Sequence, residues 1–239
     1  MTEAGKSKKN WTNLERSVLR GRGIDIGCGN DPVAPNVRKF DVDDGDANEI
    51  TKFVSEKFDF VFSSHCLEHM HNPKQAINEW WQLVKPNGYL FFIVPDEDLY
   101  EQGVFPSRFN RDHKATFTIS KSKSWSPVSV NVLELALSLP GSELVSIALQ
   151  DQGYDRRMYR HGPHHWHSRL LHRLYFRLEK YNLKFGSRNR LLVRMLQKTQ
   201  KALVRYVPDQ TLRSNASAQI QCIVRKKGEK EGRDGVTEG

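Results

Sequence analysis

Continuous apolar runs, rather than alternating apolar and polar positions, mark the stretches of this chain that are most typical of β-strands. Residues 57–63, for example, read KFDFVFS, with one acid among the apolar side chains. Such a run is expected for a strand whose two faces are both covered by other elements. The same reasoning predicts strands at 23–26, 37–43, 57–63, 89–94, 144–149 and 218–224.

Between these runs, apolar positions recur every three to four residues, which is the period of an amphipathic helix. The clearest helix begins after Asn72, an N-cap residue type, with Pro73 at its first position. Its apolar stripe consists of Ala76, Ile77, Trp80, Trp81 and Val84, and it ends at residues 85–88 (KPNG). Further helices are expected at 13–19, at 128–139 and within 156–207. Strands that alternate with helices predict an α/β fold built on a parallel sheet.

The same pattern divides the chain into one α/β domain and an insertion. Residues 1–12 are rich in lysine and have no apolar stretch, so we expect a disordered lead rather than a secretion signal. Residues 13–155 and 208–227 form the domain, and residues 156–207 are a basic helical insertion before the last strand. Residues 228–239 are expected to be a disordered, charged tail.

The composition is that of a globular protein: 38% of the 239 residues are hydrophobic and 27% are charged. No apolar run approaches the roughly 20 residues that a membrane span requires. Cys28, Cys66 and Cys222 are too far apart in the sequence for a disulfide framework or a zinc motif. We therefore expect a cytoplasmic protein that holds no metal.

The positive charge is concentrated in the insertion. Residues 156–207 contain fourteen Lys or Arg and one acid, Glu179, whereas the whole chain has a net charge of +9, so the rest of the chain is acidic. We interpret the insertion as a solvated lid, or as a surface for an anionic membrane or a lipid-linked glycan. Nucleic acid is a less favoured partner, because no RNA-binding motif is present. The basic residues that accompany its apolar stripe are Arg190, Arg194, Lys198, Lys201 and Arg205.

Residues 23–30 (GIDIGCGN) place two glycines, spaced by one residue, directly after the first predicted strand. Glycine adopts positive φ freely and lets backbone N–H groups approach a ligand, so this turn is typical of nucleotide-type sites. A dinucleotide site needs a third glycine where this chain has Pro32. The acid at the end of the strand, Asp25, suits a cationic ligand better than a pyrophosphate.

Acids and short polar residues also stand at the ends of later segments. In chain order they are Asp41 and Asp43, then Asp46 with Ala47, then Ser64 with His65. Ligands of open α/β sheets bind at the carboxyl ends of the strands. These residues are therefore expected to surround one site.

Three motifs in residues 22–95 resemble those of the S-adenosylmethionine-dependent methyltransferases with a Rossmann-like fold. They are D-x-G-x-G at 25–29, F-D-x-V followed by L-E-H at 58–69, and V-K-P-N-G at 84–88, in place of the family's L-K-P-G-G. The resemblance implies a mostly parallel sheet with a terminal antiparallel strand, and S-adenosylmethionine as cofactor. The chain departs from the family where Asp31 replaces a glycine, and where the helix after the second strand is nearly absent.

The resemblance also implies roles for the residues at the strand ends. Gly27, Cys28 and Gly29 would pack against the methionine part of the cofactor, and Ser64 and His65 would line the same part. Asp25 would order the loop or accept a hydrogen bond from the amino group. Asp41 or Asp43 would bind the ribose hydroxyls, and Asp43 is preferred for its terminal position. Asp46, with the backbone of Ala47, would bind the adenine amine.

The loop at 95–114 falls where acceptors bind in this family. His113 is the candidate general base because the pKa of a histidine is ordinarily near neutrality. Asp112 or Asp96 would orient it or serve as the base instead. Glu68 and His69 are expected to be structural. The four histidines of a turn in the insertion are expected to be hydrated rather than to bind metal: His161, His164, His165 and His167.

The favoured function is methyl transfer to a small-molecule or cell-surface saccharide acceptor, at a hydroxyl. This choice of acceptor follows from the similarity of 99–103 (LYEQG) and 112–117 (DHKATF) to a bacterial subgroup associated with surface polysaccharides. The alternative is a binding protein: an RNA-associated methyltransferase-like protein, or a cofactor-binding pseudoenzyme whose basic insertion holds an anionic partner.

Overall fold

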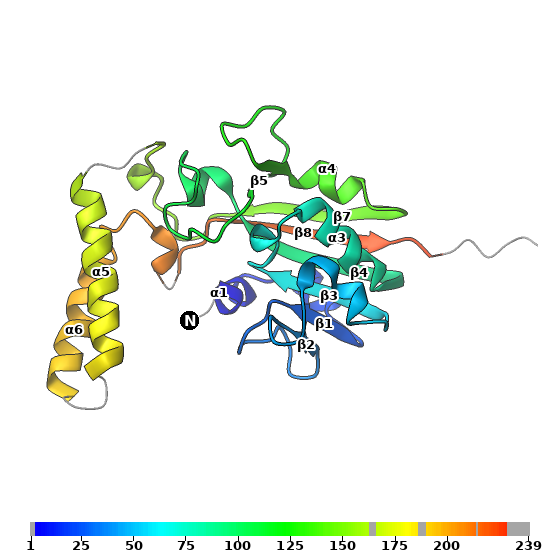
Figure 1. Ribbon diagram of the computed structural model, residues 1–239, viewed down its shortest axis with the longest axis horizontal. Helices are drawn as coiled ribbons and strands as arrows, with labels where there is room; N and C mark the ends of the chain where they lie inside the picture. The colour runs from blue at the N-terminus through cyan, green and yellow to red at the C-terminus, as the bar shows by residue number, and fades with distance from the viewer. Residues whose placement is uncertain (1–2, 163–165, 186–189, 214, 229–239) are drawn as a thin grey trace, which may run out of the picture.

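A six-stranded sheet forms the centre of the molecule, in the spatial order β2-β1-β3-β4-β8-β7 (Figure 1). The computed structural model describes residues 3–162, 166–185, 190–213 and 215–228. The strands of this sheet are β1 Gly23–Ile26, β2 Arg38–Phe40, β3 Phe58–Ser64, β4 Val84–Pro95, β7 Ser142–Gln150 and β8 Gln219–Lys226. The four strands β2, β1, β3 and β4 are parallel to one another. The last strand, β8, is antiparallel to both of its neighbours, which confirms the predicted fold class.

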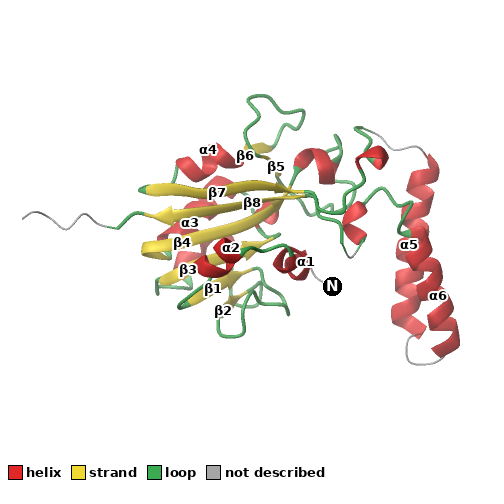
Figure 2. Ribbon diagram, turned by 180° about the vertical axis from the view of Figure 1, so that it is seen from behind, coloured by secondary structure: helices red, strands yellow, loops and turns green. Residues whose placement is uncertain are grey.

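The two faces of the sheet are covered by different helices. Helices α3 Pro73–Gln82 and α4 Val132–Leu137 pack on one face and bury the larger apolar cluster, which includes Trp80. On the other face, seen in Figure 2, α2 Asn13–Val18 and Trp11 cover Phe62. Side chains therefore leave each buried strand toward a core on both sides, as the continuous apolar runs predict.

Helix α3 begins as its sequence predicts. Asn72 is the N-cap, and its side-chain oxygen accepts a hydrogen bond from the backbone N–H of Gln75 at 3.2 Å. Pro73 occupies the first turn, where a missing N–H costs nothing. Trp80 is fully buried, and its indole N–H donates to the carbonyl of Ala47 at 2.8 Å. This contact fixes the segment after β2 against the helix and so shapes the edge of the site.

The predicted disordered lead at 1–12 is wrong for the residues that the structure describes. Residues Glu3–Lys9 form helix α1, in which Ser7 is fully buried. The hydroxyl of Ser7 accepts a hydrogen bond from Nε2 of Gln219 at 2.7 Å, and Lys6 donates to the carbonyl of Thr211. Polar side chains hold this segment in place, and because such contacts leave no apolar pattern in the sequence, the helix was not predicted.

The segment between β4 and α4 is more ordered than the expected loop. It contains the π-helical turn η3 Glu97–Glu101 and a small parallel pair, β5 Thr116–Thr118 with β6 Ser129–Asn131. Helix α4 is consequently shorter than the predicted helix at 128–139. Short 3₁₀ turns complete the chain: η1 Ala47–Lys52, η2 Leu67–His69, η4 Arg156–Met158 and η5 Gln210–Leu212.

The insertion forms a helical hairpin beside the sheet domain. Its helices, α5 Trp166–Phe185 and α6 Arg190–Leu203, lie side by side at one end of the molecule in both views (Figures 1 and 2). No helix in the described part of the chain is long and apolar enough to cross a membrane. Of the predicted tail at 228–239, residues 229–239 lie outside the described residues, as do His164 and His165 of the histidine-rich turn.

Candidate active site

The glycine turn after β1 needs glycine for two physical reasons. Gly27 and Gly29 have φ values of +76° and +53°, in the left-handed region that other residues adopt at a cost. A Cβ on Gly27 would also lie 2.7 Å from Cβ and Sγ of Cys66, whereas one on Gly29 would meet nothing within 4 Å. Gly27 is therefore held between two strand ends, and Gly29 faces open space.

Asp25 orders this turn from beneath. It is 2% exposed, and its Oδ2 accepts a hydrogen bond from the backbone N–H of Val33 at 2.6 Å. Burial raises the pKa of this carboxyl to about 7, against the opposing effect of the Val33 hydrogen bond. Asp31, which replaces a glycine of the family pattern, lies 3.5 Å from Nζ of Lys8 in α1. The lead helix thus contributes a positive charge beside the glycine turn.

Asp41, not Asp43, stands at the end of the second strand. β2 ends at Phe40, so Asp41 is the first residue beyond it and faces the glycine turn. Its Oδ2 accepts a hydrogen bond from the backbone N–H of Gly29 at 2.5 Å. Asp43 is exposed and does not line the cavity described next. The preference for Asp43 assumed a longer strand and is corrected here.

A cavity of about 620 Å³ lies at the carboxyl ends of β1, β2 and β3, a size that suits a nucleotide-type ligand. It brings together five of the predicted cofactor residues, which are Gly27, Asp41, Asp46, Ala47 and His65. Four other predicted cofactor residues lie in β1, in the glycine turn or at the end of β3 but do not line this cavity: Asp25, Cys28, Gly29 and Ser64. The sequence reasoning missed further lining residues, including Phe40, Cys66 and Met70.

Asp46 does not follow a strand, in contrast to its predicted place. It is the N-cap of η1, and its Oδ1 accepts hydrogen bonds from the backbone N–H and the side-chain amide of Asn48, both at 2.8 Å. Ala47 is held by the indole of Trp80. Both residues still line the cavity, because η1 packs against α3 close to the end of β2.

His65 adopts a positive φ of 55° at the carboxyl end of β3. Histidine is one of the few residues other than glycine that adopt a left-handed backbone conformation with any frequency. Residues in this conformation cluster at functional sites. Its Nε2 lies 2.9 Å from Oε1 of Gln219 in β8, and its Nδ1 lies 3.2 Å from Oε1 of Glu68. The ring is thereby held between the last strand and the short turn η2.

Next to the first cavity is a smaller one, of about 210 Å³, with a polar lining. The residues around it are His65, Glu68, His69, Tyr100, Asn110, His113 and Thr211. Two of them, His65 and His69, line both cavities. The smaller cavity therefore adjoins the larger one at the ends of the central strands.

His113 is buried beside this smaller cavity and is oriented by a residue that the sequence analysis did not identify. Its Nδ1 lies 2.7 Å from Oε1 of Glu101, and both side chains are almost fully buried. Asp112 instead pairs with His69, with 2.9 Å between Oδ2 and Nδ1. Asp96 caps η3 by accepting from the backbone N–H groups of Asp98 and Leu99. The predicted orienting roles of Asp112 and Asp96 are therefore corrected in favour of Glu101.

Two buried carboxyls of this region have shifted pKa values in opposite directions. Burial raises the pKa of Asp96 to about 6. Burial also opposes the ionisation of Glu68, but His65, His113 and His69 outweigh it and hold the pKa of Glu68 below its usual value. Glu68 is therefore a buried anion among imidazoles.

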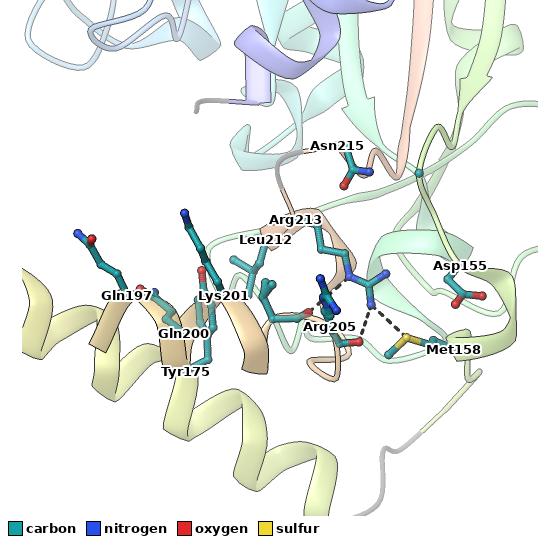
Figure 3. A pocket seen from close by; sticks show the side chains of 12 residues that line it. Asp155, Met158, Tyr175, Gln197, Gln200, Lys201, Arg205, Leu212, Arg213 and Asn215 are labelled. Carbon is teal, nitrogen blue, oxygen red and sulfur yellow. Dashed lines mark hydrogen bonds between the residues drawn. The ribbon is translucent and has the colours of Figure 1, made fainter. Parts of the chain in front are cut away.

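A larger cavity, of about 940 Å³, lies between the helical hairpin and the end of the sheet domain (Figure 3). Its wall carries positive charge from Lys201 of α6, from Arg205 in the turn after α6, and from Arg213 after η5. Arg213 also donates to the carbonyl of Arg205 at 2.8 Å. This cavity does not include the carboxyl ends of the parallel strands. The cavity of about 620 Å³ that Gly27 and Asp41 line is therefore the candidate cofactor site, although it is the smaller of the two.

The chain is similar to several known proteins. A curated, uncharacterised protein of Methanocaldococcus jannaschii is 29% identical; the alignment covers 41% of this chain and 59% of that protein, so the chain matches only part of its relative's length. A SAM-dependent methyltransferase of Archaeoglobus fulgidus is 16% identical, with a TM-score of 0.45 and coverage of 94% of each chain. A protein of Galdieria sulphuraria, described as a sarcosine dimethylglycine methyltransferase, is 13% identical, with a TM-score of 0.45 and coverage of 93% of this chain and 84% of that one.

The sequence profile of the methyltransferase domain family matches residues 8–185. This match contains the glycine turn, the histidines of the smaller cavity and the whole of helix α5. The chain therefore belongs to the methyltransferase domain family, whose methyl donor is S-adenosylmethionine.

Proposed function

We propose that this chain transfers the methyl group of S-adenosylmethionine to a hydroxyl of a small-molecule or saccharide acceptor. The observation that carries the proposal is the contact between the two cavities at His65 and His69. A cofactor in the cavity of about 620 Å³ and an acceptor in the cavity of about 210 Å³ would meet there. Methyl transfer is an in-line displacement, so holding both reactants at one junction supplies much of the rate.

The cavity of about 620 Å³ offers partners for each part of the cofactor. Asp41 would accept hydrogen bonds from the ribose hydroxyls, and Asp46 with the backbone of Ala47 would bind the adenine amine. Gly27 and His65 would lie against the methionine part. Asp25 would act indirectly, by ordering the turn that carries Gly27.

The smaller cavity is suited to a hydroxylated acceptor. Its polar side chains include Asn110, Tyr100 and Thr211, which can exchange hydrogen bonds with several hydroxyls. A hydroxyl needs a base before it can attack the sulfonium. His113 is the candidate, because Glu101 at Nδ1 leaves Nε2 to take up the proton.

The helical hairpin supports a second part of the proposal, contact with an anionic membrane or a lipid-linked acceptor. Four large apolar side chains on one side of α5 are exposed: Trp166, Leu170, Leu174 and Tyr181. Arg169, Arg173 and Arg177, at the same helical spacing, form a basic stripe beside them. Basic amphipathic helices of this kind lie at membrane interfaces.

Two measurements test the enzyme proposal. Isothermal titration with S-adenosylmethionine is expected to show binding that Gly27→Arg abolishes. Incubation with radiolabelled S-adenosylmethionine and a carbohydrate fraction is expected to give labelled product, and His113→Gln should remove the labelling while cofactor binding remains. Absence of cofactor binding would overturn the proposal. Cofactor binding without transfer, together with retention of RNA by the hairpin, would favour the alternative of an RNA-associated or pseudoenzymatic protein.

A further inference from the structure

Three potential metal ligands converge at the wall of the smaller cavity. One ligand atom from each of Glu68, His69 and His113 lies within 4.8 Å of the other two. We propose that these residues bind a divalent transition-metal ion, placed between the cofactor cavity and the acceptor cavity. No metal is expected from the sequence, because the cysteines match no zinc motif and the histidine-rich turn of the insertion is expected to be hydrated. His113 lies more than 40 positions from Glu68 and His69 along the chain.

The state of Glu68 is the first argument. Its side chain is fully buried, and neither carboxylate oxygen receives a hydrogen bond from a described residue. Nδ1 of His65 lies 3.2 Å from Oε1, but without the alignment of a hydrogen bond. A buried carboxylate without hydrogen bonds destabilises the folded protein unless a cation compensates it. The neighbouring imidazoles supply that compensation only in their protonated form, whereas a metal ion beside Glu68 would supply it with the imidazoles of His69 and His113 neutral.

The orientation of the two histidines is the second argument. Nδ1 of His113 lies 2.7 Å from Oε1 of Glu101, and Nδ1 of His69 lies 2.9 Å from Oδ2 of Asp112. Each carboxylate holds the proton on Nδ1 and leaves Nε2 with its lone pair. Nε2 of His113 indeed lies on the side of Glu68, 4.0 Å from Oε1. Metal-binding histidines characteristically make such a contact to a carboxylate with their second nitrogen.

The set of ligands selects the class of metal. Two imidazoles and one carboxylate suit first-row ions such as Zn²⁺, Co²⁺, Fe²⁺ and Mn²⁺, whereas Mg²⁺ and Ca²⁺ prefer oxygen ligands alone. Three protein ligands leave coordination positions open. Because all three residues line the smaller cavity, these positions would face the acceptor.

A role for the ion rests on the proposed function. A cation at this position would bind an oxygen of the acceptor and lower the pKa of its hydroxyl, so that the proton leaves to solvent before the oxygen attacks the methyl group. His113 would then be a ligand, because Nε2 cannot bind the metal and take up a proton at the same time. Metal binding itself does not depend on the identity of the acceptor.

The test uses the full-length protein after treatment with a chelator and removal of the chelator. Titration with Co²⁺, followed by calorimetry and by the visible absorption of the ion, is expected to show one equivalent bound. Glu68→Gln and His113→Ala should each weaken binding by at least about 100-fold, and Glu101→Gln, which acts through His113, by about 10- to 100-fold. His71→Ala is the matched control, because His71 is exposed on the same segment and lies outside the cluster.

Far-ultraviolet circular dichroism of every variant is expected to match that of the wild type, which shows that the variants are folded. Neither this measurement nor Co²⁺ binding involves S-adenosylmethionine, so the test is separate from that of the proposed function. Equal Co²⁺ affinity for the wild type and Glu68→Gln would overturn the proposal. A stronger effect of His71→Ala than of His113→Ala would do the same. Tighter binding of Mg²⁺ than of Co²⁺ would refute the proposed class of metal.

Discussion

The carboxylate of Asp41 accepts a hydrogen bond from the backbone N–H of Gly29, with 2.5 Å between the nitrogen and Oδ2. This bond joins the end of β2 to the glycine turn after β1, across two parallel strands. A second link, from the backbone N–H of Gly27 to the carbonyl of Phe40 at 2.8 Å, runs in parallel with it. Asp41 therefore shapes the turn and also lines the cavity of about 620 Å³ at the strand ends.

Replacement of Asp41 by alanine is expected to raise the dissociation constant of S-adenosylmethionine by about 10- to 100-fold. A hydrogen bond to a charged group is worth about 1.5–3 kcal/mol, and the variant loses both the ribose contact and the order of the turn. Isothermal titration measures the effect. Asp43→Ala is the matched control: this acid lies two residues further along and outside the cavity, and its replacement should leave the affinity unchanged. Equal losses in both variants would contradict this assignment.

The two glycines of the turn should differ in their tolerance of a methyl group. Gly27→Ala places Cβ against Cys66, so both the melting temperature and cofactor affinity are expected to fall. A Cβ on Gly29 would meet open space, so Gly29→Ala should lower the free energy of unfolding only by the roughly 1 kcal/mol that a left-handed backbone costs alanine. Thermal unfolding with and without S-adenosylmethionine distinguishes them. If Gly29→Ala lowered the melting temperature and the cofactor affinity as much as Gly27→Ala, the contact with Cys66 would not be the cause of the Gly27→Ala effect.

The strands and α3 could be predicted because burial on a regular element leaves a regular pattern. The continuous run before Ser64 and the Asn72–Pro73 start of α3 are local signals, and both elements form where expected. Helix α1 could not be predicted in this way. It is held by Ser7 and Lys6 through partners more than 200 positions away, and such polar contacts have no period.

The site was partly predictable for a similar reason. The glycine turn and Asp41 follow strands, so topology alone brings them together. The preference for Asp43 rested on a strand that ends at residue 43, whereas β2 ends at Phe40. Glu101 was missed because its proximity to His113 depends on η3, an irregular turn whose shape no propensity specifies.

Asp25 should make the stability of the protein decrease as the pH rises. Its pKa is about 7 in the folded protein and about 3.9 in an unfolded chain, so between these values the folded state holds a proton that the unfolded state has lost. Stability is therefore lost from about pH 4 to about pH 7 and stays lower above that range. Lys8 opposes this effect, and Asp31 and Asp41 add to it.

Asp25→Asn removes this titration and keeps an oxygen for the N–H of Val33. At pH 8 the variant is expected to exceed the wild type in free energy of unfolding by at least about 1.4 kcal/mol, the equivalent of one pKa unit. Near pH 4 the difference should vanish. Urea denaturation at a series of pH values measures it, and a difference that does not depend on pH would argue against a buried, protonated Asp25.

Ser7→Ala is expected to destabilise the protein by about 1–3 kcal/mol, because it leaves a buried N–H of Gln219 without its acceptor. The other N–H of that amide is already used by Gln150, and its oxygen lies against His65. The loss should therefore extend to the site and weaken cofactor binding. Ser17→Ala in α2 is the control, since Ser17 is exposed and bonds only within its own helix. Denaturant unfolding and cofactor titration of both variants provide the comparison.

The exposed stripe on α5 should bind vesicles that contain anionic lipid. Leu170→Glu with Leu174→Glu places two negative charges among the apolar side chains and next to Arg169 and Arg173, so binding is expected to fall by at least about 10-fold. Leu137→Glu is the matched control, because Leu137 is a similarly exposed leucine, 58% accessible, on α4 of the sheet domain. Co-sedimentation with vesicles measures binding, and added salt should weaken it by screening the arginines. Vesicle binding that Leu137→Glu reduces as much as the α5 double variant would locate the membrane contact elsewhere than on the hairpin.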